Sequence, residues 1–216
     1  MATDLRGLYA VTPDDPLLPR LTALVGSALA GGVRLVQYRN KSASPSLRRA
    51  QAAELLRLCR GHGARLIVND DLALALELGA DGVHLGGDDG DMGKARAALG
   101  PERILGVSCY DDLAAAAAAA AAGADYLAFG SVFASGTKPL APRASLDLLG
   151  EAKRRFALPI AAIGGITLAN AGEAVTAGAD MLAVITDLFD AMDISARARE
   201  YEKLFWGHHE SQRRTV

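Results

Sequence analysis

The sequence has few cysteines and almost no net charge. Its 216 residues include two cysteines, Cys59 and Cys109, and the formal net charge is −2. Two isolated cysteines match neither a metal-site spacing nor a disulfide framework, so we expect reduced, buried thiols in a cytoplasmic protein. A general nucleic-acid binder usually carries a basic excess. The charge balance therefore predicts no nucleic-acid partner, and any anionic ligand has to be held by a local site.

The sequence also shows no signal-peptide pattern in its first residues and no long apolar run. Residues 1–6 have neither the basic stretch nor the apolar core of a signal peptide. The nine alanines at residues 114–122 are too few to span a membrane, so we expect no membrane association. Alanine favours helix, and we predict a helix here that is capped by Asp111 and stopped by Gly123. The polar residues 207–216 are predicted to form a flexible tail.

What the sequence does contain is a repeated joint. Gly-Ala-Asp occurs three times, at residues 79–81, 123–125 and 178–180, each time between a helix-like stretch and a short apolar run. A looser copy lies at residues 30–32. Glycine ends helices in the left-handed conformation that other residues resist. The repeats therefore predict a parallel sheet with one helix per strand.

Eight short apolar runs are predicted to be strands, and these are residues 7–11, 35–38, 66–69, 82–85, 104–108, 126–129, 160–163 and 181–185. Capping residues and periodicity predict helices between them, at residues 44–60, 71–78, 94–99, 145–156, 167–177 and 193–206. Ser44, Ser145, Thr167 and Asp193 are the expected N-caps.

These units predict a (β/α)8 TIM barrel in a single domain over residues 1–206. Eight units in 216 residues give about 27 residues per unit, which is enough for this fold. The alternative is an open doubly wound sheet, which normally carries a glycine-rich phosphate loop after its first strand. Residues 12–16 follow the first strand here and contain no glycine, so we favour the barrel.

Polar residues gather after the predicted strands, where a barrel places its chemistry. Gln37, Arg39 and Lys41 alternate at the end of the second strand, so their side chains can point the same way. Lys138 follows the sixth strand and can join Arg39 and Lys41 in holding an anion. Each of these motifs alone is an ordinary solvated strand end, and their shared position is what favours a site.

A second anion site is predicted after the last two strands. Gly164-Gly165 precedes a helix and offers backbone N–H groups to a phosphate. Thr186 follows the eighth strand, and phosphate sites in this fold usually lie between these two strand ends. The sequence therefore indicates a site for two anions.

Two aspartates at the same end indicate a divalent metal. Asp70 and Asp89 would repel a diphosphate unless a cation lay between, since two unit charges 4 Å apart interact by about 1–4 kcal/mol. Two carboxylates with phosphate oxygens and waters suit Mg²⁺. The simpler alternative is that Asp70 is a helix cap and Asp89 a solvated loop residue.

No side chain stands out as a general base or nucleophile. His84 lies inside a predicted strand and is interpreted as structural, and nothing local marks Cys109 as activated. The chemistry is therefore expected to rest on positioning and electrostatics, which suit the departure of a metal-held diphosphate.

Six motifs, in order along nearly the whole chain, resemble the thiamine-phosphate synthase family: Gln37-Tyr38-Arg39-Asn40-Lys41, Val68-Asn69-Asp70, Val83-His84-Leu85-Gly86 with Asp89, Gly106-Val107-Ser108, Gly136-Thr137-Lys138-Pro139 and Ala162-Ile163-Gly164-Gly165-Ile166. The resemblance implies a transferase that joins hydroxymethylpyrimidine diphosphate to a thiazole phosphate and releases pyrophosphate. It implies a dissociative route: the diphosphate leaves, a pyrimidine carbocation forms, and the thiazole nitrogen attacks it.

Site residues carry over by position. The pyrimidine diphosphate is expected to bind Gln37, Arg39, Lys41, Asn69, Ser108 and Lys138, of which Arg39, Ser108 and Lys138 are the expected catalytic residues. Mg²⁺ is expected on Asp70 and Asp89. The thiazole phosphate is expected to bind Ser135, Gly136, Thr137, Gly165, Ile185 and Thr186.

The sequence departs from the family pattern in places. Tyr38 and Asn40 replace the more usual leucine and acidic residue, and Ser135 stands where threonine is common. Asp88 or Asp91 could take the place of Asp89 at the metal.

The main alternative is the related thiazole tautomerase, an isomerase of the same fold. That branch tends to have a histidine where this chain has Tyr110, and it needs no diphosphate clamp. A non-catalytic phosphate-binding barrel is a further alternative, disfavoured by the cationic residues. The sequence leaves the oligomeric state open, a homodimer included.

Overall fold

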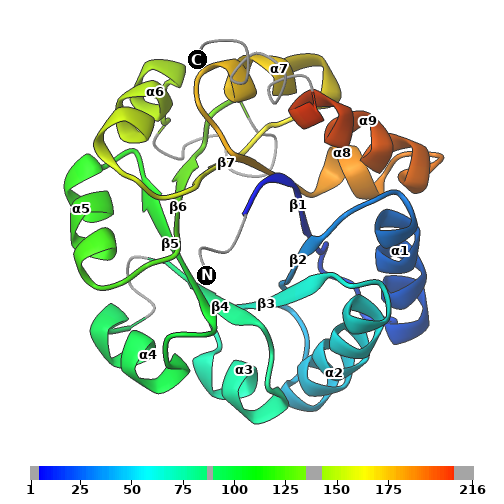
Figure 1. Cartoon of the computed structure of the whole chain (residues 1–216). Coiled ribbons are helices and arrows are strands. Elements are labelled where there is room, and N and C mark those ends of the chain that lie inside the picture. The colour runs from blue at the N-terminus through cyan, green and yellow to red at the C-terminus, as the bar shows by residue number, and fades with distance from the viewer. Residues whose placement is uncertain (1–4, 87–89, 135–142, 207–216) are drawn as a thin grey trace.

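The computed structural model describes residues 5–86, 90–134 and 143–206. Its strands form a closed barrel in the order β1 to β8, and β1 pairs with β8 to complete the ring. All pairings are parallel, and the helices surround the ring on its outside (Figure 1). The predicted TIM barrel is confirmed.

The strands match the predicted runs to within two residues. They are β1 (Gly7–Val11), β2 (Leu35–Tyr38), β3 (Arg65–Asn69), β4 (Gly82–Leu85), β5 (Ile104–Tyr110), β6 (Tyr126–Gly130), β7 (Ile160–Ile163) and β8 (Met181–Val184).

The helices include two that were not predicted individually, α1 and the short α8. The full set in the described residues is α1 (Leu18–Ala30), α2 (Pro45–Gly61), α3 (Leu72–Leu78), α4 (Met92–Leu99), α5 (Leu113–Ala121), α6 (Leu146–Arg155), α7 (Leu168–Thr176), α8 (Thr186–Phe189) and α9 (Ile194–Trp206). The caps at Ser44 and Ser145 are confirmed by hydrogen bonds from Leu47 N and Leu148 N. The cap predicted at Asp111 is wrong: Asp112 accepts from Ala114 N at 2.7 Å, because the helix begins one residue later.

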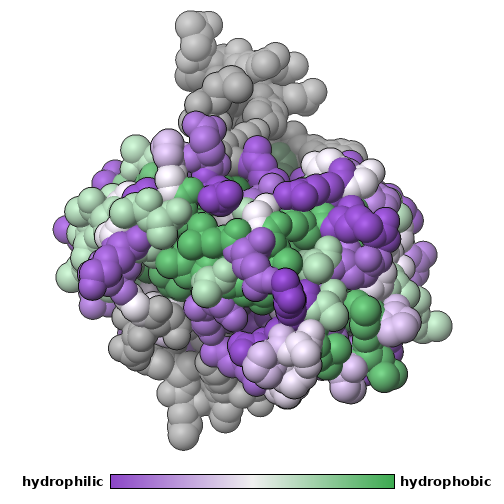
Figure 2. All heavy atoms as spheres, turned by 90° about the horizontal axis from the view of Figure 1, so that it is seen from below, coloured by the Kyte–Doolittle hydropathy of each residue, from purple (hydrophilic) through white to green (hydrophobic). Residues whose placement is uncertain are grey.

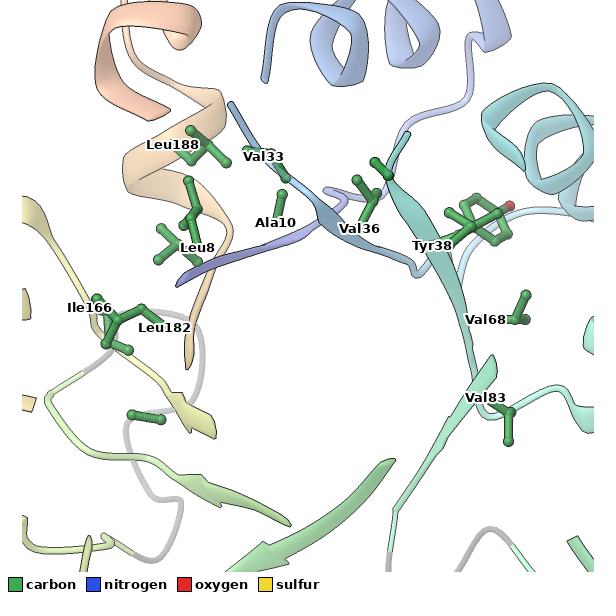
Figure 3. Close-up of a cluster of buried hydrophobic side chains, with 14 of the residues drawn as sticks. Leu8, Ala10, Val33, Val36, Tyr38, Val68, Val83, Ile166, Leu182 and Leu188 are labelled. Atoms are coloured by element: carbon green, nitrogen blue, oxygen red, sulfur yellow. The ribbon is translucent and has the colours of Figure 1, made fainter. Parts of the chain in front are cut away.

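Alternate residues of each strand face opposite sides of the barrel wall. Leu8, Ala10, Val36, Val68 and Val83 point outward to the helices (Figure 3) and belong to the larger apolar cluster. A smaller cluster fills the barrel interior, with Tyr9, Leu35, Ile67, Ile104 and Tyr126 among its members. This parity decides which polar residues at the strand ends face the interior.

The Gly-Ala-Asp joints do more than end helices. Gly79, Gly123 and Gly178 have the predicted positive φ, at 65°, 88° and 115°. The carboxylate of each following aspartate reaches back to the preceding odd-numbered strand and accepts a backbone N–H. Asp81 accepts from Leu66, Asp125 from Leu105 and Asp180 from Ile160, at 2.7–2.8 Å.

β1, the first odd-numbered strand, has the same kind of contact, but its carboxylate comes from a helix and not from a Gly-Ala-Asp joint. Directly before β2, where the strict joints have their aspartate, the chain has Arg34, and Glu202 of α9 accepts from Leu8 N at 3.1 Å instead. Each odd-numbered strand therefore starts on a carboxylate. We call these four contacts, at Asp81, Asp125, Asp180 and Glu202, the carboxylate latches.

The outer surface mixes apolar and polar side chains. Figure 2 shows the flank at the bottom of Figure 1, where α3 lies, with an apolar patch among hydrophilic side chains. Within the described ranges, no helix is long and apolar enough to cross a membrane.

Candidate active site

The predicted site residues that the structure describes lie at one end of the barrel. Gln37, Asn69 and Ser108 are at or near the carboxyl ends of β2, β3 and β5, with Arg39, Lys41 and Asp70 in the segments that follow. Gly165 follows β7, and Ile185 and Thr186 follow β8. Asp88, Asp89, Ser135, Gly136, Thr137 and Lys138 lie outside the described residues.

The three polar side chains at and after the end of β2 point in different directions. Gln37 points into the barrel, is 4% exposed and donates from Nε2 to the Tyr9 hydroxyl at 2.8 Å. Arg39 turns toward the loop after β1, where its Nη1 lies 3.0 Å from Asp14 Oδ1. Lys41 turns toward β3, and its Nζ lies 3.2 Å from Asp70 Oδ2. Arg39 and Lys41 thus bring positive charge to the mouth from two sides.

The backbone that carries these side chains is fixed by a buried polar cluster. Asn40 is 5% exposed and donates from Nδ2 to Asp15 O at 2.9 Å and to Gln51 Oε1 at 3.0 Å. Tyr38 donates to the same Gln51 oxygen at 2.9 Å. The two departures from the family pattern, Tyr38 and Asn40, therefore share one partner on α2.

Asp70 is not a helix cap. The N-cap of α3 is Asp71, whose Oδ1 accepts from Leu74 N at 2.9 Å. Asp70 has a φ of 61°, its backbone N–H donates to His84 O, and its carboxylate faces Lys41. Aspartate tolerates the left-handed region better than most residues. The carboxylate is thus aimed at the mouth and away from the helix.

Asp91, an alternative metal ligand, is occupied elsewhere. It is the N-cap of α4, and its Oδ1 accepts from Lys94 N at 3.0 Å. This contact ties Asp91 to the helix start and leaves the earlier aspartates of that loop as the better candidates.

A chain of buried hydrogen bonds crosses the barrel interior. It runs from Gln37 to Tyr9, then to the Tyr126 hydroxyl at 2.7 Å, to His84 Nδ1 at 2.8 Å, and from His84 Nε2 to Ser108 Oγ at 2.8 Å. The two tyrosines meet edge to face, and Tyr126 stacks on His84. Two predicted substrate contacts, Gln37 and Ser108, are therefore linked through three residues that were not predicted.

The sequence did not identify Tyr9 or Tyr126 as part of the site. It also did not show that His84 links Tyr126 to Ser108. His84 was interpreted as structural, yet its ring touches Ser108. The signal was available in the strand parity, since all three side chains sit at interior positions. An aromatic hydroxyl buried in a barrel interior needs a polar partner.

Cys109, directly after Ser108, is a buried thiol and not an activated one. Burial raises the pKa of Cys109 to about 12, and that of Cys59 to about 12. Both cysteines are free and buried. Tyr110 follows at a register shift in β5, with a φ of 53° and a half-exposed ring. The interpretation of Cys109 as unactivated is confirmed.

The end of β7 approaches the β6 end closely. Gly164 and Gly165 have φ values of 102° and 64°. A β-carbon on Gly165 would overlap the carbonyl oxygens of Phe133 and Ala134. Only glycine lets these two loops meet, which brings the β6 end to the predicted phosphate site.

The short helix α8 begins at Thr186, directly after Ile185. Its Asp187 carboxylate accepts from Tyr201 Oη at 2.7 Å and from Arg197 Nη1 at 2.6 Å, both on α9. Leu168 N at the start of α7 lies 3.3 Å from the same oxygen. Asp187 therefore fixes the position of Thr186 relative to the helix that follows Gly165.

Comparisons with known proteins agree over nearly the whole chain. A family model described as "Thiamine monophosphate synthase" matches residues 8–188. The thiamine-phosphate synthase of Aromatoleum aromaticum is 55% identical over 203 residues, covering 94% of this chain and 98% of that protein. The thiamine-phosphate synthase of Chromobacterium violaceum is 57% identical over 199 residues, covering 92% of this chain and 96% of that protein. A solved thiamine phosphate pyrophosphorylase from Pyrococcus furiosus is 34% identical with a TM-score of 0.83, covering 93% and 96% of the two chains.

Proposed function

Because this chain belongs to the thiamine monophosphate synthase family, we propose that the mouth of its barrel is where the hydroxymethylpyrimidine group is transferred from its diphosphate to the thiazole phosphate. The protein is a transferase, and its products are thiamine monophosphate and pyrophosphate. The observation that carries the proposed site is the meeting of Lys41 with Asp70 at the strand ends, above Gln37 and Ser108.

The leaving diphosphate would be held by cations from two strand ends. Arg39 and Lys41 reach the mouth from the segment after β2, and Lys138 is expected to add a third charge. Positive groups placed where negative charge develops lower the barrier without a proton transfer. In the structure Arg39 is paired with Asp14 and Lys41 with Asp70.

The donor chemistry of the mouth fits Mg²⁺ on Asp70 and Asp89. Asp70 offers a carboxylate that is partly exposed at the strand ends. Mg²⁺ usually keeps several waters and is held by one or two carboxylates together with phosphate oxygens. When bound, Mg²⁺ supplies positive charge that stabilises the departing pyrophosphate.

The pyrimidine would lie deeper, between Gln37, Asn69 and Ser108, which come from three strands of the ring. The thiazole phosphate would bind at Gly165, Ile185 and Thr186, with Ser135, Gly136 and Thr137 from the loop after β6. Phosphate sites of this fold lie at that position. The two substrates then face each other across the mouth, so the thiazole nitrogen can attack the carbocation once the diphosphate has left.

The tautomerase alternative has no support in the comparisons, since the relatives reported above are named as synthases. Cytoplasmic location, a homodimer and the lack of a nucleic-acid partner stay predictions. The buried free cysteines are consistent with a reducing compartment.

The test is pyrophosphate release from both substrates at increasing Mg²⁺ concentration, for the wild type, Asp70→Asn and Asp71→Asn. Asparagine also tolerates the left-handed conformation of Asp70 and is a good N-cap at position 71, so both variants are expected to fold. We expect Asp70→Asn to need much more Mg²⁺ and Asp71→Asn to behave as the wild type. Equal Mg²⁺ dependence in the three proteins would remove Asp70 from the metal site.

A further inference from the structure

The buried chain across the barrel has a direction that can be worked out by counting protons. Gln37 donates from its amide nitrogen to the Tyr9 oxygen at 2.8 Å. Tyr9 is 1% exposed, so its own hydroxyl hydrogen needs a partner, and the Tyr126 oxygen lies 2.7 Å away. A buried hydroxyl hydrogen without an acceptor would cost about 1–3 kcal/mol. Tyr9 therefore donates to Tyr126.

The same count continues to Ser108. Tyr126, having accepted from Tyr9, donates to His84 Nδ1 at 2.8 Å. A neutral imidazole that accepts at Nδ1 carries its proton on Nε2. His84 Nε2 then donates to Ser108 Oγ, 2.8 Å away. The Ser108 hydroxyl hydrogen is left to point at a ligand.

Burial keeps the phenols protonated, as this count requires. Desolvation raises the pKa of Tyr9 and of Tyr126 well above the ordinary value for tyrosine. Both rings therefore stay phenols at neutral pH, and each passes on one hydrogen.

We propose that Gln37, Tyr9, Tyr126 and His84 form a directional hydrogen-bond chain that fixes the Nε2–H tautomer of His84 and holds Ser108 as a donor toward the pyrimidine diphosphate. The identity of the ligand rests on the proposed function, whereas the direction of the chain does not. His84, Tyr126 and Tyr9 are positioning residues, because they act through Ser108.

This direction matches the ligand. The ring nitrogens and phosphate oxygens of a pyrimidine diphosphate accept hydrogen bonds, whereas an amino group on the ring donates them. A serine whose oxygen is already occupied by His84 offers its hydrogen. In the reverse direction Ser108 would donate to His84 and present lone pairs to these acceptors.

The direct test is the protonation state of the His84 ring in the free protein. Nitrogen NMR of histidine-labelled protein at mildly alkaline pH separates protonated from unprotonated ring nitrogens, and the His84 signals are those absent from His84→Gln. We expect hydrogen on Nε2 alone. Hydrogen on Nδ1, alone or together with Nε2, overturns the proposal. This result does not depend on substrate turnover, so a failure of the proposed function would be seen separately.

Two variants at His84 provide a matched kinetic test. Glutamine can place an amide N–H close to the position of Nε2, whereas asparagine reaches only the position of Nδ1. We expect His84→Gln to keep most of the wild-type kcat/KM for the pyrimidine diphosphate and His84→Asn to lose about tenfold to a hundredfold, as for one hydrogen bond to a charged or buried group. The KM for the thiazole phosphate should stay unchanged in both. Equal losses in the two variants, or a shift of both KM values, would indicate a packing role only and overturn the proposal.

Discussion

Gly106 lies beside the ring that connects the two halves of the buried chain. A β-carbon at this position would overlap the phenol group of Tyr126. Gly106 is in the middle of β5, two residues before Ser108, and its φ is not in the left-handed region. Its lack of a side chain is therefore required for space, and the space is filled by a group that reaches the site.

Gly106→Ala is expected to displace the Tyr126 ring and to break its contact with His84. Overpacking of this kind costs about 1–3 kcal/mol of unfolding free energy. Urea unfolding and kcat/KM for the pyrimidine diphosphate should both fall. Gly172→Ala on the exposed face of α7 is the matched control, because a β-carbon there has no neighbour within 4 Å. Wild-type stability of Gly106→Ala would show that the ring has room to move.

At the scale of elements, the carboxylate latches differ in their second partner. Asp125 also accepts from Arg96 Nη2 at 2.6 Å, and Asp180 from Lys153 Nζ at 2.7 Å. For Asp81, the described residues show no cation within salt-bridge distance. The same backbone contact is thus made with and without an ion pair.

Asp81→Ala and Asp125→Ala should therefore destabilise the protein to different extents. Each leaves a strand N–H without its acceptor, at a cost of about 1–3 kcal/mol. Asp125→Ala should cost more, since Arg96 also loses its carboxylate, although partial exposure of the pair reduces that share. The denaturation midpoints measure the difference. Equal midpoints would mean that Arg96 adds nothing.

The elements show how far a sequence could predict this molecule. The glycine conformations, strand positions and most caps depend on neighbouring residues and were predicted correctly. Other contacts depend on which elements become neighbours in the folded barrel. These are the hydrogen bond from Leu66 N to Asp81, the contact of Asn40 with Gln51 and the hydrogen-bond chain through His84. Local patterns carry no information about such pairings until the barrel has closed. The helix α8 was missed because four residues are too few to show a periodicity.

At the scale of the whole molecule, two carboxyl groups on or next to α9 respond to burial in opposite directions. Burial alone would raise the pKa of Asp187, but hydrogen bonds from Tyr201 and Arg197 outweigh it and hold that pKa below its ordinary value. Burial raises the pKa of Glu202, although its bond from Leu8 N and the charge of Arg34 work the other way. The charged form of Asp187 therefore stabilises the folded state, whereas the charged form of Glu202 destabilises it.

Asp187→Asn should lower the unfolding free energy at neutral pH. The depressed pKa of Asp187 in the folded state means that its contribution is fully present above the unfolded pKa, near 3.9. It is lost as the pH falls through the lower, folded value. The gap between wild type and variant should thus shrink below about pH 4. Urea titrations at several pH values measure it, and a gap that stays constant down to the acid range contradicts this assignment.

Glu202→Gln should change the unfolding free energy in the opposite direction to Asp187→Asn. The folded pKa is raised, so stability is greatest below the unfolded pKa and is lost as the pH rises through the folded value. Glutamine keeps an acceptor for Leu8 N without the charge. At neutral pH the variant should be at least as stable as the wild type, and this advantage should vanish in acid. A variant less stable than the wild type at neutral pH would show that the charge itself is needed.

The carboxylate latches also set an order of events during synthesis on the ribosome. Three of them join residues that are 15, 20 and 20 positions apart, so each can close soon after its aspartate emerges. The fourth joins Leu8 to Glu202, 194 positions later. At about 5–20 residues per second, the earliest strand waits roughly ten to forty seconds for its partner. The first strand to be made is thus the last of the four to gain its carboxylate contact.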